Sequence, residues 1–239
     1  MGSRPNPPYL ITPCYLAGPD GTVTGSLITR LLDDGWQTDS CGDALVFSRR
    51  EEGGLLEALH TRHGNPSARD ESPDTAWEFT ARSGPGQAAA WTVRFAPETP
   101  PELIAALAAA LTDPDQEPSP GNRPHYLRAP ASHEEATRPL EAAGWMRDLA
   151  EHECAWYAPR QQAVAITPIP PDTCGNGGAN WLLAALRQID HTALWYATAH
   201  PHTPTHLIHA LCARLADPTP VPRPTCPGPE TGRLTVTRP

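Results

Sequence analysis

The sequence predicts an α+β fold of two tandem repeats, each with a mainly antiparallel sheet of about four to five strands, a short N-terminal helix and a longer C-terminal helix. Three observations predict it. The stretch at 77–114 recurs at 181–218 with the same length. Apolar and polar residues alternate within the copies, as in strands with one buried face, and each copy ends in an apolar stripe of helical spacing.

The repeat divides the 239 residues into segments. They are a disordered N-terminus (1–8), a first repeat (9–114), a proline-rich linker (115–124), a second repeat (125–218) and a disordered proline-rich tail (219–239). The chain has 30 prolines and an apolar fraction of only 39%, and we assign the excess proline mainly to the linker and the tails. Each repeat, at about 100 residues, is long enough for a modest core of its own.

Each repeat opens with a short strand and a helix. The segments 9–13 and 126–130 both run from a tyrosine to a proline, and a proline ends a strand because it has no N–H to donate. Apolar residues at helical spacing across 26–34 then predict a helix that ends at Gly35. In the second repeat, Pro139 is not expected inside a regular helix, so we predict a short helix that begins there.

A hairpin and a further pair of strands follow in each repeat. Hairpin strands are expected near 43–48 and 55–60, with counterparts at 154–158 and 163–169. An antiparallel sheet covered on one face is the simplest arrangement for this order of elements. The later strands are marked by buried-type residues at a period of two, which are Trp77, Phe79, Ala81, Trp91, Val93 and Phe95, then Trp181, Leu183, Ala185, Trp195 and Ala197.

A helix with a strong start signal closes each repeat. Thr99, Pro100 and Glu102 fit an N-cap, a proline at the first helical position and a capping-box glutamate. A stripe of leucine and isoleucine follows, and an Asp-Pro pair ends the helix in both copies. The second copy keeps the Thr-Pro pair but has His206 in place of the capping glutamate.

Four features match one known family. They are the opening Tyr-Leu-x-x-Pro, the Gly-Trp pairs at 35–36 and 144–145, the pair of tryptophan strands and the closing Thr-Pro-x-x-Leu-Ile-x-Ala-Leu helix. On these motifs the chain resembles the SPDY family, an actinobacterial domain of unknown function (domain of unknown function 317), over nearly all of 9–114 and 125–218. The resemblance implies a tandem pair of domains and no established activity.

The motif that names this family, Ser-Pro-Asp, is expected at the hairpin turn. Here it is reduced to Ser48-Arg49-Arg50 in the first repeat and Ala158-Pro159-Arg160 in the second. A turn that tolerates such changes in both copies is interpreted as structural rather than catalytic.

Charge and cysteine content narrow the classes of partner. The net charge of −9 repels phosphate backbones and anionic lipids unless the 18 basic residues, all arginine, gather on one face. The 6 cysteines show no metal-ligand spacing and do not recur between the repeats, so free thiols in a reducing cytoplasm are expected. With no apolar stretch long enough for a membrane span or a signal segment, we expect a soluble cytoplasmic protein without membrane contact.

One cluster of potential metal ligands occurs. At about 100° per residue, His202, His206 and His209 fall within about 60° of one another near the start of the last helix, away from its apolar stripe. Neutral imidazoles at this spacing are competent ligands for zinc or nickel. The first repeat has no histidine at these places, so a solvated helix face that drifted to histidine is the simpler alternative. No other cofactor is expected.

The strand arginines define a second candidate site. We expect the 7 tryptophans to pack in the core, because alternation places the strand arginines on the opposite face, where they cannot help a tryptophan to bind a nucleic-acid base. The surface left for a partner carries Arg49, Arg50, Arg82 and Arg94. Nucleic-acid binding requires that set to converge in space, or else the set of Arg128, Arg147 and Arg160.

No motif of a hydrolase, a metalloprotease or a nucleotide-binding loop is found in the sequence. We therefore expect a non-enzymatic protein that binds another macromolecule, most simply a protein. A nucleic-acid-binding protein that uses a tandem sheet surface and a metal-binding protein that uses the histidine stripe are the alternatives. Because the copies share packing residues and differ on their solvent faces, function is expected where they disagree.

Overall fold

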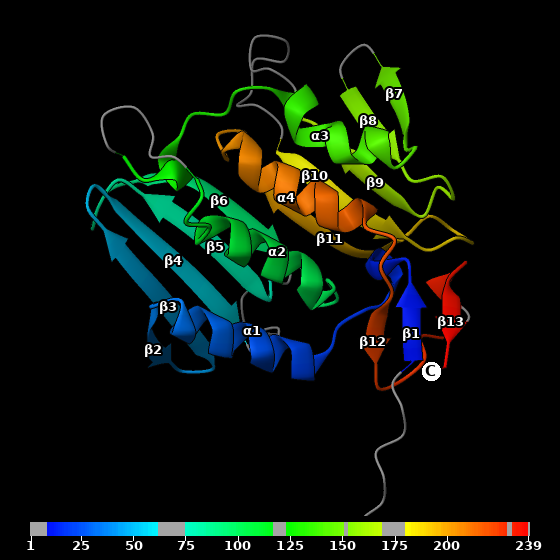
Figure 1. Ribbon diagram of the computed structural model, residues 1–239, viewed down its shortest axis with the longest axis horizontal. Helices are drawn as coiled ribbons and strands as arrows, with labels where there is room; N and C mark the ends of the chain where they lie inside the picture. The colour runs from blue at the N-terminus through cyan, green and yellow to red at the C-terminus, as the bar shows by residue number, and fades with distance from the viewer. Residues whose placement is uncertain are drawn as a thin grey trace, which may run out of the picture.

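The computed structural model describes residues 9–61, 75–116, 123–150, 153–168, 180–228 and 231–238. Within them lie a ten-stranded sheet, a three-stranded sheet and four α-helices (Figure 1). The large sheet has the strand order β2-β3-β4-β5-β6-β11-β10-β9-β8-β7, with every neighbouring pair antiparallel. Its strands are β2 (Gln37–Cys41), β3 (Ala44–Glu51), β4 (Gly54–Thr61), β5 (Trp77–Arg82), β6 (Ala89–Phe95), β7 (Met146–Ala150), β8 (Glu153–Tyr157), β9 (Ala163–Ile166), β10 (Trp181–Leu186) and β11 (Ala193–Ala199).

The two repeats meet at the centre of this sheet. Strand β6 pairs with β11, and Arg94 lies opposite Thr198 there. The predicted fold class, an α+β pair of repeats that each have their own sheet of four to five strands, is therefore wrong. The free edges of β6 and β11 pair with each other, which removes two unpaired edges and leaves one continuous sheet. Strands β2 and β7 form its outer edges.

The helices α1 (Gly21–Asp33), α2 (Pro101–Leu111), α3 (His133–Ala142) and α4 (Thr205–Ala216) cover one face of the sheet (Figure 1). Helix α2 contacts α1 and α4, and α4 also contacts α3. The tryptophans of β5, β6, β10 and β11 are only 2–3% exposed and pack between the sheet and these helices, as the alternation predicted. The predicted helix lengths are wrong for the first repeat, because α1 has 13 residues and α2 has 11.

The start of α2 differs from the prediction. Its N-cap is Pro100, with no side-chain hydrogen bond to the first turn, so the capping box of Thr99 and Glu102 is not formed. The carboxylate of Glu102 instead forms two hydrogen bonds with the guanidinium of Arg223, at 2.6 and 2.7 Å. Glu102, which the local sequence pattern predicts as a cap of α2, forms a long-range ion pair instead.

Helix α3 begins earlier than predicted. The side chain of Ser132 caps it by accepting hydrogen bonds from the backbone of Glu134 and Glu135, and Pro139 lies inside the helix. Because proline has no N–H, the carbonyl of Glu135 loses its usual donor four residues later. The imidazole Nδ1 of His209 on α4 lies 3.0 Å from that carbonyl oxygen and donates to it instead. The interior proline is thus accommodated by a neighbouring helix.

The small sheet joins the two ends of the described chain. Strand β1 (Tyr9–Thr12) pairs with β12 (Val221–Arg223) on one side and β13 (Thr235–Thr237) on the other. The prediction of a disordered tail after 218 is therefore wrong for these strands. The segment predicted as a strand at 126–130 is also different, since a 3₁₀ turn, η2 (His125–Leu127), opens the second repeat. The predicted disordered terminus (1–8) and most of the linker (115–124) lie outside the described residues.

Candidate functional site

The face of the ten-stranded sheet opposite the helices, here called the open face, is the main candidate. In the first repeat it is polar, because alternation points Glu57, Glu78, Arg82 and Arg94 away from the tryptophan core. Arg82 Nε lies 2.7 Å from a Glu57 carboxylate oxygen, and Arg94 Nε lies 2.7 Å from one of Glu78. This polar half is therefore already neutralised by cross-strand ion pairs.

In the second repeat the open face is apolar around β9 and β10, and the exposed Asp148 of β7 lies on the same face opposite Ala155. A cluster separate from the helix-side core centres on Ala155, Val164 and Ala184, which are 3–5% exposed. Larger side chains, each partly exposed, surround these small ones. We define the apolar half as Ala155, Tyr157, Val164, Ile166, Leu182, Ala184, Leu186 and Tyr196.

The sequence contains the signal for this apolar half. Strands β5 and β10 have the same length and the same buried positions, yet their outward positions differ. Glu78, Thr80 and Arg82 of β5 correspond to Leu182, Ala184 and Leu186 of β10. The residues that the two copies keep do not reveal these substitutions, which appear only when the outward positions are compared. They lie on the solvent faces, where the two copies differ.

The arginines proposed as a partner surface are only partly brought together. Arg82 and Arg94 lie on the polar half, and Arg50 is exposed on the same side of β3. Arg49 points to the opposite side and pairs with Glu51 at 3.1 Å. The four arginines therefore do not form one basic patch.

The second arginine set is spread over separate elements. Arg147 on β7 donates to Sγ of Cys154 at 3.3 Å and lies over the ring of Trp156. Arg160, after β8, donates to the backbone carbonyl of Arg233 at 3.1 Å. Arg128 follows the turn η2. These positions do not supply the converging arginines that the nucleic-acid alternative requires.

The three predicted metal ligands have separate partners. His206 Nε2 lies 3.1 Å from Nδ1 of His125, a residue 81 positions earlier that no sequence pattern linked to it. His209 Nδ1 lies 3.0 Å from the backbone carbonyl oxygen of Glu135 on α3. His202 is exposed, and its backbone N–H donates to Nδ1 of His200. Among the described residues, no three His, Cys, Asp or Glu side chains are grouped so that they can hold a metal ion.

The His125–His206 pair is held in its neutral form. Burial, and to a lesser extent the nearby His125 and Arg128, lower the pKa of His206 to about 4. Burial also lowers the pKa of His125. Two neutral rings can share one N–H···N hydrogen bond, so the pair links η2 to the first turn of α4 without a net charge.

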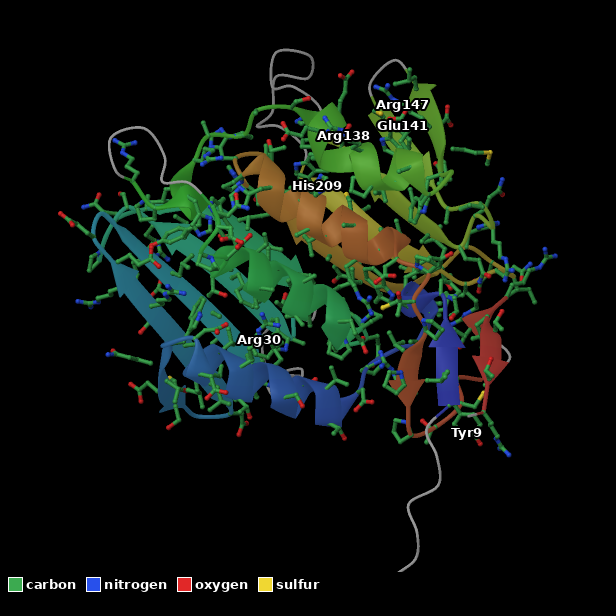
Figure 2. All side chains as sticks on the ribbon, viewed as in Figure 1. Tyr9, Arg30, Arg138, Glu141, Arg147 and His209 are labelled. Carbon is green, nitrogen blue, oxygen red and sulfur yellow. The ribbon has the colours of Figure 1, made fainter. Side chains whose placement is uncertain are left out.

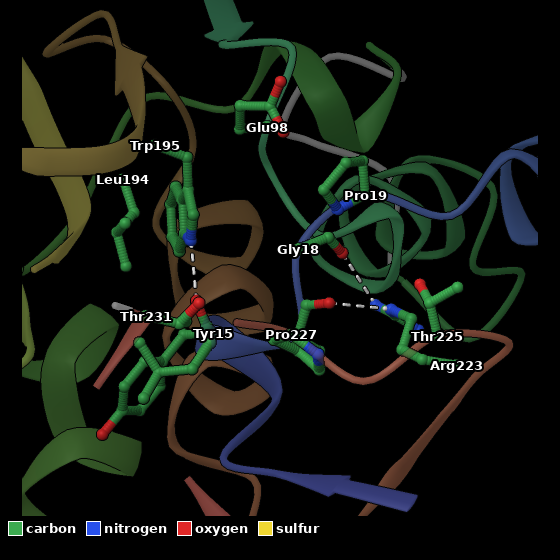
Figure 3. A pocket seen from close by; sticks show the side chains of 12 residues that line it. Tyr15, Gly18, Pro19, Glu98, Leu194, Trp195, Arg223, Thr225, Pro227 and Thr231 are labelled. Atoms are coloured by element: carbon green, nitrogen blue, oxygen red, sulfur yellow. Dashed lines mark hydrogen bonds between the residues drawn. The ribbon is translucent and has the colours of Figure 1, made fainter. Parts of the chain in front are cut away.

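A pocket of about 370 Å³ lies beside the small sheet, lined among others by Tyr15, Leu194, Trp195 and Arg223 (Figure 3). The guanidinium of Arg223, 2% exposed, donates to Glu102 and to three backbone carbonyls, of Ala17, Gly18 and Pro222. All its donors are used, so Arg223 holds the tail in place and offers no free cation to a ligand.

The comparisons with known proteins identify a family. SPDY, a domain of unknown function (DUF317), matches residues 57–117 and 160–221, which is just over half of the chain. Each match runs from the middle of its repeat to a few residues beyond the closing helix, a narrower span than the predicted one. No curated protein and no solved structure matches the chain.

Among the described residues, no helix is both long enough and apolar enough to cross a membrane. The two family matches fall on the two sequence repeats, and they confirm the tandem family prediction. The chain belongs to the SPDY family, a domain of unknown function (DUF317), and carries two copies of its domain.

Proposed function

We propose that this protein is a non-enzymatic binding protein that holds another protein on the open face of its ten-stranded sheet. The observation that carries the proposal is the apolar half. Its small residues are buried beneath partly exposed Tyr157, Ile166, Leu186 and Tyr196. Contiguous apolar surface with aromatic residues, bordered by a polar region, is typical of a protein interface.

A protein partner fits this surface better than a nucleic acid. The eight residues of the apolar half include no basic side chain that can contact a phosphate. On the neighbouring polar half, Arg82 and Arg94 are each paired with a glutamate at 2.7 Å. The net charge of −9 adds a long-range repulsion of phosphate backbones.

A binding role also fits the way in which the repeats diverge. The shared positions are core tryptophans, prolines and helix leucines, and no polar constellation is duplicated. Between the copies, the open face changes from charged to apolar while the helix-side core is kept. Such a change alters what the surface can contact and leaves the scaffold intact.

The test compares immobilised wild-type protein with a variant that gives the apolar half the character of the polar half. Leu182→Glu with Thr198→Arg places at β10 and β11 the residues that form the Glu78–Arg94 pair in the first repeat. Arg138→Ala, on the exposed side of α3, is the matched control. We expect extracts of the source cell to yield a protein that wild type and control retain and the double variant loses. Identical captured proteins from all three would contradict the proposal.

A further inference from the structure

We infer that the pocket beside the small sheet is a binding site for a small organic cation, an amine with an apolar body. Its volume of about 370 Å³ lies at the lower end of the roughly 300–1,000 Å³ that is usual for small-molecule sites. None of the residues that line it belongs to the apolar half of the open face. The inference therefore goes beyond the proposed function and is tested separately from it.

The pocket is built where both repeats and the tail meet. Its walls come from three parts of the chain, which are 15–19 in the first repeat, 194–195 in the second repeat and part of the tail, beginning at Arg223. Trp195 Nε1 donates to the carbonyl of Tyr15 at 2.7 Å, and Arg223 donates to the carbonyl of Gly18 at 3.0 Å. These bonds hold the three parts in place before a ligand arrives, which lowers the entropic cost of binding.

The unbalanced charge of the pocket is negative. Arg223 is part of the wall, but both carboxylate oxygens of Glu102 accept hydrogen bonds from it, at 2.6 and 2.7 Å, so these two charges cancel. The other charged residue of the lining is Glu98, which is exposed and whose carboxylate has no hydrogen bond or ion pair within the described part of the chain. A carboxylate without a partner at the rim of a pocket favours a ligand that carries a positive charge.

The accessible walls of the pocket are mainly apolar. Pro19 is exposed, and Leu194 and Pro227 are partly exposed. Figure 3 shows Glu98 on the opposite side of the pocket from Pro227. A ligand whose amine lies at Glu98 can therefore place an apolar body against Leu194 and Pro227. Most small-molecule sites combine apolar walls with a small number of polar groups in this way.

Other classes of small ligand fit this pocket less well. An organic anion would need the guanidinium of Arg223, whose donors are already used by Glu102 and by backbone carbonyls. Glu98 and the net charge of −9 also repel an anion. The second repeat has His202 at the place of Glu98, so the carboxylate is not part of the shared scaffold, and we expect Glu98→Gln to keep the fold.

The test is isothermal titration calorimetry of the full-length protein with phenethylamine, phenethyl alcohol and phenylacetate. The probes share a phenyl ring, and near neutral pH their end groups are positive, neutral and negative. We expect saturable one-to-one binding of the amine, binding of the alcohol that is weaker by about tenfold or more because it lacks the charge, and no binding of phenylacetate. No heat of binding for the amine at millimolar concentration, or equal affinity for all the probes, overturns the inference.

Two variants test the position of the site. Glu98→Gln keeps the size of the side chain and removes its charge, so it is expected to weaken amine binding by about tenfold and to leave alcohol binding unchanged. Thr225→Lys adds a cation at an exposed position of the lining and is expected to weaken amine binding too, which keeps the test valid if the first variant unfolds.

Glu52→Gln is the matched control. Glu52 is an exposed carboxylate that lines a different pocket, the one beside His125, and its substitution is expected to leave amine binding unchanged. Amine binding that is insensitive to both Glu98→Gln and Thr225→Lys overturns the inference, as does an equal loss of binding in Glu52→Gln and Glu98→Gln.

Discussion

The indole Nε1 of Trp195 donates a hydrogen bond of 2.7 Å to the backbone carbonyl of Tyr15, which lies 180 residues earlier. The same bond, also 2.7 Å long, joins Trp91 to the carbonyl of Tyr126. Tyr15 lies in the turn η1 (Cys14–Leu16), which opens the first repeat, and Tyr126 lies in η2, which opens the second. Each turn therefore completes the core of the other repeat, so the repeats are interlocked and neither has a complete core of its own.

Loss of either indole hydrogen bond is expected to destabilise the whole chain. Trp195→Phe and Trp91→Phe each leave a buried carbonyl without its donor, at a cost of roughly 1–3 kcal/mol in the free energy of unfolding, beyond the effect of the smaller ring. Trp36→Phe is the control, because the Nε1 of Trp36 is buried and has no hydrogen-bond partner among the described residues. Urea denaturation measures all three. Equal losses for Trp36 and Trp195 would show that the bond contributes nothing.

The Arg223–Glu102 pair is expected to anchor the tail. Their side chains are 2% and 14% exposed, so Arg223→Ala leaves a nearly buried carboxylate without a counter-ion. Breaking such a pair costs roughly 3–5 kcal/mol of unfolding free energy. The comparison is Arg30→Ala on the surface of α1 (Figure 2), where the pair with Asp34 is exposed and worth about 0–1 kcal/mol. Similar urea midpoints for the two variants would refute the anchoring role.

His209 and Pro139 are expected to be energetically coupled. His209→Ala removes the donor to the Glu135 carbonyl and is expected to cost about 0.5–1.5 kcal/mol of unfolding free energy. In a Pro139→Ala background the residue at 139 regains an N–H, the helix satisfies that carbonyl itself, and the loss of His209 should cost less. A double-mutant cycle measures the difference. Strict additivity would mean that His209 does not compensate for the proline.

The His125–His206 pair predicts a stability that falls in mild acid. The pKa of His206 is about 4 in the folded protein, below the ordinary value of 6.5. Between these two pH values the unfolded chain binds more protons, so the free energy of unfolding decreases as the pH falls from 6.5 toward 4. Thermal melting of wild type and His206→Gln should diverge across this window, with the variant less sensitive to pH. His202→Gln, at an exposed site, is the control. Parallel curves for wild type and His206→Gln would contradict the prediction.

The sequence predicts local elements well where burial imposes a period. The strands at Trp77 and Trp181 and the last helix were found because their apolar residues recur at two or at three to four positions. Strand β2 was missed because all five of its residues are exposed and show no alternation. Strand β7 was also missed, and its Met146 and Leu149 are 52% and 65% exposed.

The local sequence pattern does not predict which distant strands and side chains pair with each other. The residues of β6 carry no signal that its free edge pairs with β11, so the sequence does not predict that the two repeats share one sheet. The predicted capping box does not form because Glu102 pairs with Arg223, which lies 121 residues away. The apolar half can be predicted from the sequence, since Leu182 and Leu186 replace Glu78 and Arg82 at the corresponding positions of the second repeat.

The most direct measurement of the central claim is site-specific photo-cross-linking in the cell. A photoreactive amino acid placed at Leu182 reports on the apolar half, and one placed at Arg138 reports on the exposed side of α3. The account predicts that position 182 cross-links to a partner protein and that position 138 does not. Cross-links at 138 together with none at 182 would contradict it.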